Sequence, residues 1–550
     1  MPASLFSVLS NTGLSLSQSR KAVLILTILT APFLASGCGS GSSSSSTAEP
    51  VPSFTLMEAT IGTTHAALSE GAITCVDLVE AYFERIRVYD KTTGINTIIR
   101  TNPAALDTAA EIDQKIDAGE PLGSLYCVPV LVKDLYNTFD MPTSGGNLSL
   151  ANSVPPDDAF MIRALRDEDA IMIAKTNTDE FAFSAARTVS SLGGLTRNAY
   201  GLDRTSAGSS GGSAAGLAAN FGLVATASDT GNSIRGPASH ASLVGLRSTM
   251  GLLSREGVIP LIAERDMSGV VTRTVEDTAR LMNVIVGFDP ADPITALSEG
   301  NIPDDYTAFL DENGLEGARL GVFRRLIDET ADPDVITLFE NAISDLRLAG
   351  AEIVDPFDVP NYEEVIDGVE RCFSFRYYFD LYLDSLGPDA PVTSLEDLLA
   401  NGQFSAVHAN SLRSALAVEG APDEQDPPCL GEPGNIAANP GQQAFRDAVV
   451  TAMEDQGVDA LIYPTWDNAP QPLGENYSDI PSNVGDNSQG LAPFSGQPAI
   501  TVPMGFDGFG LPLGLQIFGK PFEEGLLIQY AYAYEQATRH RIPPPLFPEL

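Results

Sequence analysis

The sequence predicts an α/β fold in which a β-sheet is covered by helices on both faces. Short apolar segments with the character of buried strands alternate with amphipathic helical segments along most of the chain. The chain has 550 residues, of which 43% are hydrophobic and 19% charged, a composition that supports a large core and differs from that of disordered chains. Residues 53–550 contain no internal repeat and no Pro/Gly-rich linker. These residues are therefore expected to form one folded domain.

The first half of this domain alternates between the two periodicities. Apolar residues at spacings of three and four predict helices, whereas short apolar runs bounded by polar residues predict buried strands. Helices are expected over 54–90 with a break near 69–71, and over 103–117, 159–166 and 213–219. Strands are expected over 128–132, 170–174 and 224–228. Two of these strands end at a lysine, Lys133 and Lys175.

The second half returns to the same alternation after one interruption. Helices are expected over 274–286, 334–349 and 524–539, and strands over 320–323, 459–463 and 499–503. Residues 360–450 break the pattern and are predicted to be a variable insertion that contributes to a pocket. Within it, Tyr377, Tyr378 and Phe379 either line an apolar channel or belong to the core.

The charge balance excludes some classes of partner. The chain has 31 Lys+Arg against 72 Asp+Glu, a formal net charge of −41. Such a surface repels nucleic-acid phosphates and anionic membranes. Because the acidic residues are spread along the chain, they indicate a solvated acidic surface.

The N-terminus has the pattern of an export signal. Arg20 and Lys21 precede the apolar run 22–33, which is too short to span a bilayer, and small residues lead to Cys38. Residues 1–38 are therefore predicted to be a signal peptide with a lipobox-like end, and 39–52 a Gly/Ser-rich tether. We expect export to the periplasm or cell envelope. A lipid anchor at Cys38 would be the one membrane contact, and an ordinary cleaved signal is the alternative.

Four cysteines follow the predicted signal. Cys75, Cys127, Cys372 and Cys429 are widely spaced and fit no zinc motif. An exported protein can oxidise them. Cys372 and Cys429 are one conceivable pair, but the sequence leaves the pairing open.

A turn after the strand predicted at 224–228 has the features of a nucleophilic site. Ser233 follows Thr230, Gly231 and Asn232, and such a turn exposes successive backbone N–H groups that can bind an oxyanion. A serine nucleophile needs a base, and none of the four histidines lies in a motif-like context. Burial lowers the pKa of a lysine, so Lys133 is the candidate base and Lys175 its rival.

Several of these segments together resemble the amidase signature family. The resemblance rests on Gly208-Ser-Ser-Gly-Gly-Ser213, Asp229-Thr-Gly-Asn-Ser-Ile-Arg235 and Val244-Gly-Leu246, supported by Val-Lys-Asp at 132–134. It extends over about residues 53–545, and the run 531–536 is similar to bacterial peptide amidases. The resemblance implies a single large α/β/α sandwich with a central mixed, twisted β-sheet.

The resemblance also implies a Ser-Ser-Lys triad. Ser233 would be the nucleophile, Ser209 would follow a cis peptide bond and relay protons, and Lys133 would be the terminal base. The oxyanion hole would consist of the N–H groups of Thr230, Gly231, Asn232 and Ser233, and Asp229 and Arg235 would support the turn. Asn232 stands where the family more commonly has glycine, so its side chain would narrow the pocket or prevent a positive φ. No metal or cofactor is implied.

The resulting expectation is an exported amidase that hydrolyses a C–N bond through an acyl-Ser233 intermediate. Its substrate would be a peptide C-terminal amide or a small acyl or aryl amide, and the protein a monomer or homodimer. Three alternatives remain open: a fatty-acid-amide-type hydrolase, a non-catalytic exported binding lipoprotein, and an α/β-hydrolase. The last would use Ser210 within Gly-Ser-Ser-Gly-Gly, with His408 or His540 as base.

Overall fold

A computed structural model divides the chain into two units, Met1–Val51 and Pro52–Leu550. It describes residues 54–327, 330–370, 373–425, 439–474 and 484–550. The predicted signal peptide and tether therefore lie outside the described residues, as do Cys372 and Cys429.

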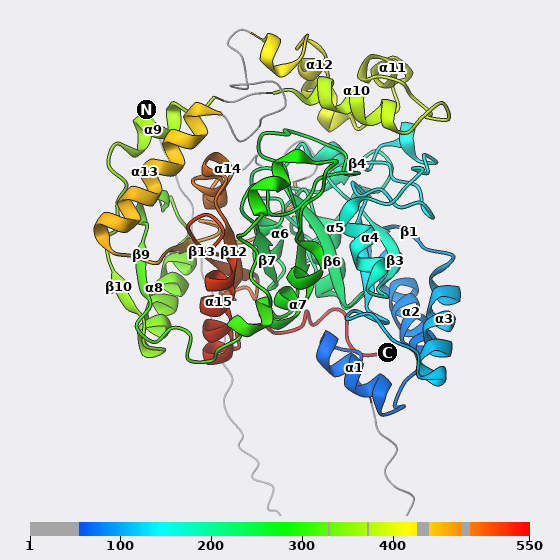
Figure 1. The fold of residues 1–550 in the computed structure, drawn as a ribbon, viewed down its shortest axis with the longest axis horizontal. Helices are drawn as coiled ribbons and strands as arrows, with labels where there is room; N and C mark the ends of the chain where they lie inside the picture. Colours follow the sequence, from blue (N-terminus) through cyan, green and yellow to red (C-terminus); the bar gives the residue numbers. More distant parts are fainter. Residues whose placement is uncertain (1–53, 328–329, 371–372, 426–438, 475–483) are drawn as a thin grey trace, which may run out of the picture. The chain divides into compact units, whose positions relative to one another are not determined.

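An 11-stranded mixed sheet forms the centre of the second unit (Figure 1). Its strand order is β1-β3-β2-β6-β8-β7-β12-β13-β11-β9-β10. Its strands are β1 Ile98–Thr101, β2 Pro129–Lys133, β3 Ile171–Thr176, β6 Val224–Asp229, β7 Val244–Arg247, β8 Met267–Thr272, β9 Arg319–Val322, β10 Glu352–Val354, β11 Ala460–Pro464, β12 Ala499–Phe506 and β13 Pro512–Phe518. A separate small hairpin pairs β4 Val189–Ser190 with β5 Gly194–Leu195.

Helices cover both faces of this sheet, which confirms the predicted α/β fold class. For example, α5 packs on β2 and β6, whereas α15 packs on β12. The helices are α1 Ile61–Ser69, α2 Cys75–Thr93, α3 Ala105–Ala118, α4 Phe160–Asp167, α5 Gly211–Ala218, α6 Arg235–Ser239, α7 Val275–Ile285, α8 Pro333–Leu348, α9 Tyr362–Asp367, α10 Phe375–Ser385, α11 Leu395–Asn401, α12 Ala409–Leu416, α13 Pro440–Gln456, α14 Ala492–Ser495 and α15 Glu524–Thr538. No helix in the described ranges has the length and apolar character that a membrane span requires.

Three neighbouring strands bring distant motifs to one edge of the sheet. β2 pairs in parallel with both β3 and β6. The carboxyl ends of parallel strands lie at the same edge, so the residues that follow these strands meet there. This edge therefore holds Lys133, the segment after Thr176 and the turn after Asp229.

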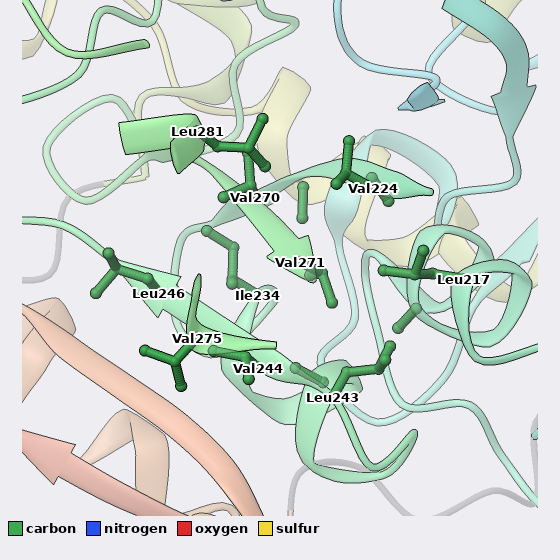
Figure 2. Packing of buried hydrophobic residues seen from close by; sticks show 14 of the residues in the cluster. Leu217, Val224, Ile234, Leu243, Val244, Leu246, Val270, Val271, Val275 and Leu281 are labelled. Carbon is green, nitrogen blue, oxygen red and sulfur yellow. The ribbon is translucent and has the colours of Figure 1, made fainter. Parts of the chain in front are cut away.

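The core packs directly beneath the turn after β6. Ile234, the residue after Ser233, is fully buried and lies beside β7 and β8 (Figure 2). A Cβ on Gly269 of β8 would come within 2.6 Å of Ile234 Cδ1, and one on Gly245 of β7 within 3.1 Å of Cγ2. Glycines at these two positions make the space in which Ile234 anchors the turn.

The predicted elements occur at the expected places, usually within one or two residues. Thr74 caps α2 by accepting a hydrogen bond from the N–H of Asp77 at 3.0 Å. The helix expected over 54–90 begins later, at Ile61. Strands β1, β7, β8, β10 and β13 of the large sheet were not expected, and neither were the hairpin strands β4 and β5. Within the predicted insertion at 360–450, the described residues form α9 to α12 and the start of α13.

One of the open questions about the cysteines has an answer. Cys75, the first residue of α2, forms a disulfide with Cys127, just before β2. The two residues are 52 positions apart. Closing a loop of that length restricts the unfolded chain and stabilises the fold by roughly 4 kcal/mol in the chain-entropy treatment.

Candidate active site

Lys133 lies at the end of β2, fully buried, with its amine among three serine hydroxyls. Its Nζ is 2.7 Å from Ser209 Oγ, 2.8 Å from Ser210 Oγ and 2.9 Å from Ser228 Oγ. The backbone N–H of Lys133 donates to Thr226 Oγ1 of the adjacent β6 at 2.9 Å. Hydrogen bonds at both the backbone N–H and the side-chain amine therefore fix the position of Lys133.

The surroundings of Lys133 favour a neutral amine. Burial lowers its pKa to about 7, and the negative charges of Asp229, Asp179 and Asp266 limit that fall. None of these carboxylates forms an ion pair with Lys133 within the described residues. Hydroxyl groups solvate the amine without a compensating charge, so near neutral pH a substantial fraction of Lys133 is unprotonated.

The hydrogen bonds around Lys133 direct its lone pair. A neutral amine has two N–H donors and one lone pair. Ser210 Oγ lies 3.3 Å from the carbonyl oxygen of Ser228, which can take its proton and leave Ser210 as an acceptor for the lysine. Ser209 Oγ, 2.7 Å from Nζ, accepts a hydrogen bond from the charged amine and can donate to the lone pair once the lysine is neutral. Lys133 is therefore placed to accept a proton from Ser209.

The glycine-rich turn that carries Ser209 is packed too tightly for side chains. The Gly208–Ser209 peptide bond is cis, as the resemblance implied. A Cβ on Gly208 would lie 1.9 Å from the carbonyl oxygen of Arg187, and one on Gly212 2.1 Å from that of Asn177. The carbonyl of Ser209 accepts the backbone N–H of Asp179 at 3.0 Å. These contacts fix the position of the Ser209 hydroxyl.

A buried carboxylate with two arginines holds the turn after β6. Arg235 Nε lies 3.1 Å from Asp229 Oδ2 and Arg247 Nη1 2.8 Å from Asp229 Oδ1, and all three side chains are fully buried. Burial alone would raise the pKa of Asp229, but the two guanidinium groups lower it to about 2. Arg235 Nη2 also donates to the carbonyl of Gly231 at 2.7 Å. The predicted support by Asp229 and Arg235 is confirmed.

This turn presents backbone donors that the protein does not use. Among the described residues, no hydrogen bond is donated by the N–H groups of Thr230, Gly231, Asn232 or Ser233. Ser233 is 4% exposed, and its hydroxyl makes no hydrogen bond to Ser209 or to any other described residue. Buried N–H groups are normally paired, so a run of free ones is suited to an oxyanion.

Asn232 does not narrow the pocket. Its side chain is fully buried and lies against Gly236, where a Cβ would come within 2.4 Å of Asn232 Nδ2. Asn232 is not among the described residues with a positive φ, and neither is Gly231. The pocket narrowing expected of Asn232 is therefore wrong, because its side chain packs against Gly236. Its φ is not positive, which agrees with the other effect expected of this side chain.

The rival lysine has a different role. In the register of β2 and β3, Lys133 pairs with Thr176 and Val132 with Lys175, so the two lysines point to opposite faces of the sheet. Lys175 Nζ lies 3.8 Å from Asp134 Oδ1 and donates to the carbonyl of Tyr136 at 2.6 Å. Burial lowers its pKa to about 8. It contacts none of the candidate serines in the described residues.

Neither candidate histidine reaches Ser210. His408 Nε2 lies 3.1 Å from Asp179 Oδ1, and His540 Nε2 lies 3.8 Å from Asp345 Oδ2. The hydroxyl of Ser210 contacts Lys133 and Ser228 instead. Within the described ranges, moreover, no group of three or more His, Cys, Asp or Glu side chains could hold a metal ion.

An apolar cavity of about 280 Å³ opens beside the turn. It extends from Thr230 and Ser228 to Tyr378 of α10. Most of its remaining wall is apolar and includes Leu135, Ile259, Leu261, Met267 and Ile294. Of the three adjacent aromatics, Tyr378 lines this cavity, Phe379 belongs to the core and Tyr377 is exposed.

Comparison with known proteins identifies the family. The amidase family model matches residues 77–528. The chain belongs to the amidase family. It is 32% identical to a probable amidase of Arabidopsis thaliana over 512 residues, which cover 89% of this chain and 92% of that protein. It is 33% identical to a glutamyl-tRNA(Gln) amidotransferase subunit of Gloeothece citriformis over 464 residues, or 81% and 91% of the two chains.

A solved structure gives the same assignment. The crystal structure of native peptide amidase from Stenotrophomonas maltophilia matches with a TM-score of 0.77 and 35% identity, covering 90% of this chain and 99% of that one. The resemblance to the amidase signature family is thus confirmed, and this amidase is an enzyme that hydrolyses C–N amide bonds. The α/β-hydrolase interpretation is wrong.

Sequence reasoning missed several residues of the site. Ser210 was considered only as a nucleophile and Ser228 not at all, yet both contact Lys133. Arg247 was also missed, although it directly follows the quoted motif at 244–246. Asp266, which accepts a hydrogen bond from Thr230 Oγ1 at 2.5 Å, has no local signal in the sequence.

We expect Asp229→Asn to destabilise the amidase strongly. The substitution leaves two buried guanidinium groups without a counter-charge, which typically costs about 3–5 kcal/mol. A denaturant titration of both proteins measures the loss. The control is Glu84→Gln, which removes an exposed partner of Arg87 and should change little. Equal midpoints for Asp229→Asn and the parent would contradict the supporting role of Asp229.

Proposed function

We propose that this amidase acts through an acyl-enzyme on Ser233, with Ser209 as proton relay and Lys133 as terminal base. The observation that carries the proposal is the 2.7 Å contact between Lys133 Nζ and Ser209 Oγ, beside a turn with free N–H donors. A lysine with a pKa of about 7 can act as a general base at neutral pH.

In the proposed reaction, neutral Lys133 takes the proton of Ser209 while Ser209 takes that of Ser233. Ser233 Oγ attacks the amide carbonyl, and the resulting oxyanion is bound by N–H groups of the turn at 230–233. The proton then returns through Ser209 to the nitrogen, the C–N bond breaks and the amine leaves. Water hydrolyses the acyl-enzyme by the same relay and regenerates Ser233.

The cavity beside the turn supports a small or medium acyl group. Its volume of about 280 Å³ lies at the lower end of ordinary ligand pockets, and its wall is largely apolar. This favours a peptide C-terminal amide or a small acyl or aryl amide over a long fatty-acid amide. The similarity to a peptide amidase supports the first of these.

The surface charge supports action on free small molecules or peptides. The amidotransferase relative from Gloeothece citriformis is named for a tRNA-linked reaction, but a net charge of −41 disfavours such a partner for this chain. We propose that the enzyme works without nucleic acid, as a monomer or homodimer.

We also propose export and a lipid anchor at Cys38. The basic pair at 20–21, the short apolar run at 22–33 and the small residues before Cys38 support it. The disulfide between Cys75 and Cys127 is consistent with an oxidising compartment.

The pH dependence of hydrolysis tests the lysine base. Because Lys133 must be neutral to accept a proton and its pKa is lowered to about 7, kcat/KM should rise with pH through that value. Lys133→Met should lose hydrolysis by about 10²-fold or more near neutrality. Lys115→Met, on the surface, should retain the parent profile. Full activity of Lys133→Met, or a profile flat across pH 7, would contradict the assignment.

Covalent labelling tests the nucleophile. A fluorophosphonate should modify Ser233, and peptide mass spectrometry locates the adduct. Labelling should disappear in Ser233→Ala and slow greatly in Lys133→Met, because the serine is then no longer activated. An adduct on Ser210, or unchanged labelling of Ser233→Ala, would refute the proposed nucleophile. A folded parent that is never labelled would favour a non-catalytic protein.

Fractionation of bacterial cells that express the full chain tests the anchor. The parent should separate with the membranes, and Cys38→Ala should move to the soluble periplasmic fraction because it has no thiol to lipidate. A Ser43→Ala chain, altered in the tether but with Cys38 intact, serves as the control. Recovery of the parent from the soluble cytosolic fraction would refute both export and anchoring.

A further inference from the structure

Gln489 lies over the turn although it comes from a distant part of the chain. It ends the short 3₁₀ helix Asn487–Gln489 that precedes α14. A Cβ built on Gly231 would lie 3.4 Å from Gln489 Oε1 and 3.6 Å from its Cδ. The amide group of Gln489 is therefore in van der Waals range of the second residue of the turn, and its side chain is only partly buried.

Two links hold this segment against the turn. Arg235 Nη1 donates to the carbonyl of Ser488 at 2.9 Å, while Nη2 of the same guanidinium donates to that of Gly231 at 2.7 Å. Asn487 Nδ2 donates to the carbonyl of Pro464 at the end of β11, at 3.0 Å. The position of Gln489 is thus set by the same arginine that supports the turn.

Asp486 determines which way the Gln489 amide faces. Gln489 Nε2 donates to Asp486 Oδ2 at 2.7 Å, and Ser488 Oγ donates to Asp486 Oδ1 at 2.7 Å. An ionised carboxylate only accepts hydrogen bonds, so Gln489 must turn its NH₂ group towards Asp486. Its carbonyl oxygen is then left towards Gly231, and it accepts no hydrogen bond from any described residue.

We propose that Gln489 Oε1 accepts a hydrogen bond from the N–H of the scissile carboxamide and so makes the site selective for amides over esters. This inference rests on the proposed function, in which the turn binds the oxyanion. A serine nucleophile with a proton relay attacks amides and esters alike, so selectivity needs a group that recognises nitrogen. The N–H becomes a stronger donor as the nitrogen is protonated, which makes this contact stronger in the transition state.

The orientation of Gln489 also links amide selectivity to pH. Burial raises the pKa of Asp486 to about 7, and the charged or titratable groups that face it are Arg235, Asp229 and Tyr463. Below that pH the protonated carboxyl can donate to Gln489 Oε1 and turn the amide round. Lys133 titrates in the same range but serves both substrate types, so the amide-to-ester ratio of kcat/KM isolates Asp486.

The test compares a primary carboxamide and a methyl ester of the same N-acylated amino acid. At a pH above 7, Gln489→Met should lower kcat/KM for the amide by about three- to tenfold, the net value of one hydrogen bond, and change that for the ester less than about twofold. Asp486→Asn should also lower the amide-to-ester ratio of kcat/KM. Gln456→Met, a matched substitution at the end of α13, should change neither substrate.

The outcomes separate this inference from the proposed function. The parent ratio should fall below pH 7, and that of Gln489→Met should stay constant. Equal effects of Gln489→Met on amide and ester, or no effect on either, would overturn the role of Gln489 and leave Ser233 in place. Hydrolysis of both substrates by Ser233→Ala would overturn both proposals. The rate of fluorophosphonate labelling, which involves no N–H, shows whether each variant is folded. If Gln489→Met does not fold, Asp486→Asn provides the same test.

Discussion

The candidate site depends on the buried carboxylate of Asp229. A charge this deep in the protein is tolerable only because two guanidinium groups surround it. Each arginine also donates to backbone carbonyls. Arg235 binds the carbonyls of Gly231 and Ser488, and Arg247 binds that of Arg265 at 2.9 Å. One ion cluster thereby joins the turn, the segment at 486–490 and the loop that leads into β8. Such a cluster contributes geometry more than stability, because hydrophobic replacements of buried ion pairs are often equally stable.

The same carboxylate affects the lysine on the neighbouring strand. Lys133 and Lys175 are equally buried, but Lys175 has Asp134 at 3.8 Å and its pKa falls only to about 8. Lys133 has serine hydroxyls instead of a counter-ion, and its pKa falls to about 7. The charge of Asp229 keeps that pKa from falling further. The separation of Asp229 from Lys133 thus leaves an amine that is partly unprotonated near pH 7, as the proposed role of general base requires.

The sequence predicted the parts of this arrangement that are local. The apolar run 128–132 ends at Lys133 because a buried strand ends there, and the polar turn after β6 marks the sheet edge. The missed strands contain residues selected for close packing. Gly269 in β8 makes room for Ile234, and a Cβ on Gly514 in β13 would come within 2.6 Å of Thr501 Oγ1. Such glycines weaken the apolar pattern by which a strand is predicted from sequence.

Contacts between residues that are distant in the sequence could not be predicted from local sequence patterns. Ser210 and Ser228 were not predicted as partners of Lys133, because their contact depends on how α5 packs on β2 and β6. Gln489 had no signal, since its position follows from Arg235. This division has a chemical meaning. In the proposed mechanism, the segments with recognisable patterns supply the groups that attack the carbonyl, and such groups act on amides and esters alike. The proposed recognition of the amide nitrogen comes instead from Gln489, which lies in a segment without such a pattern.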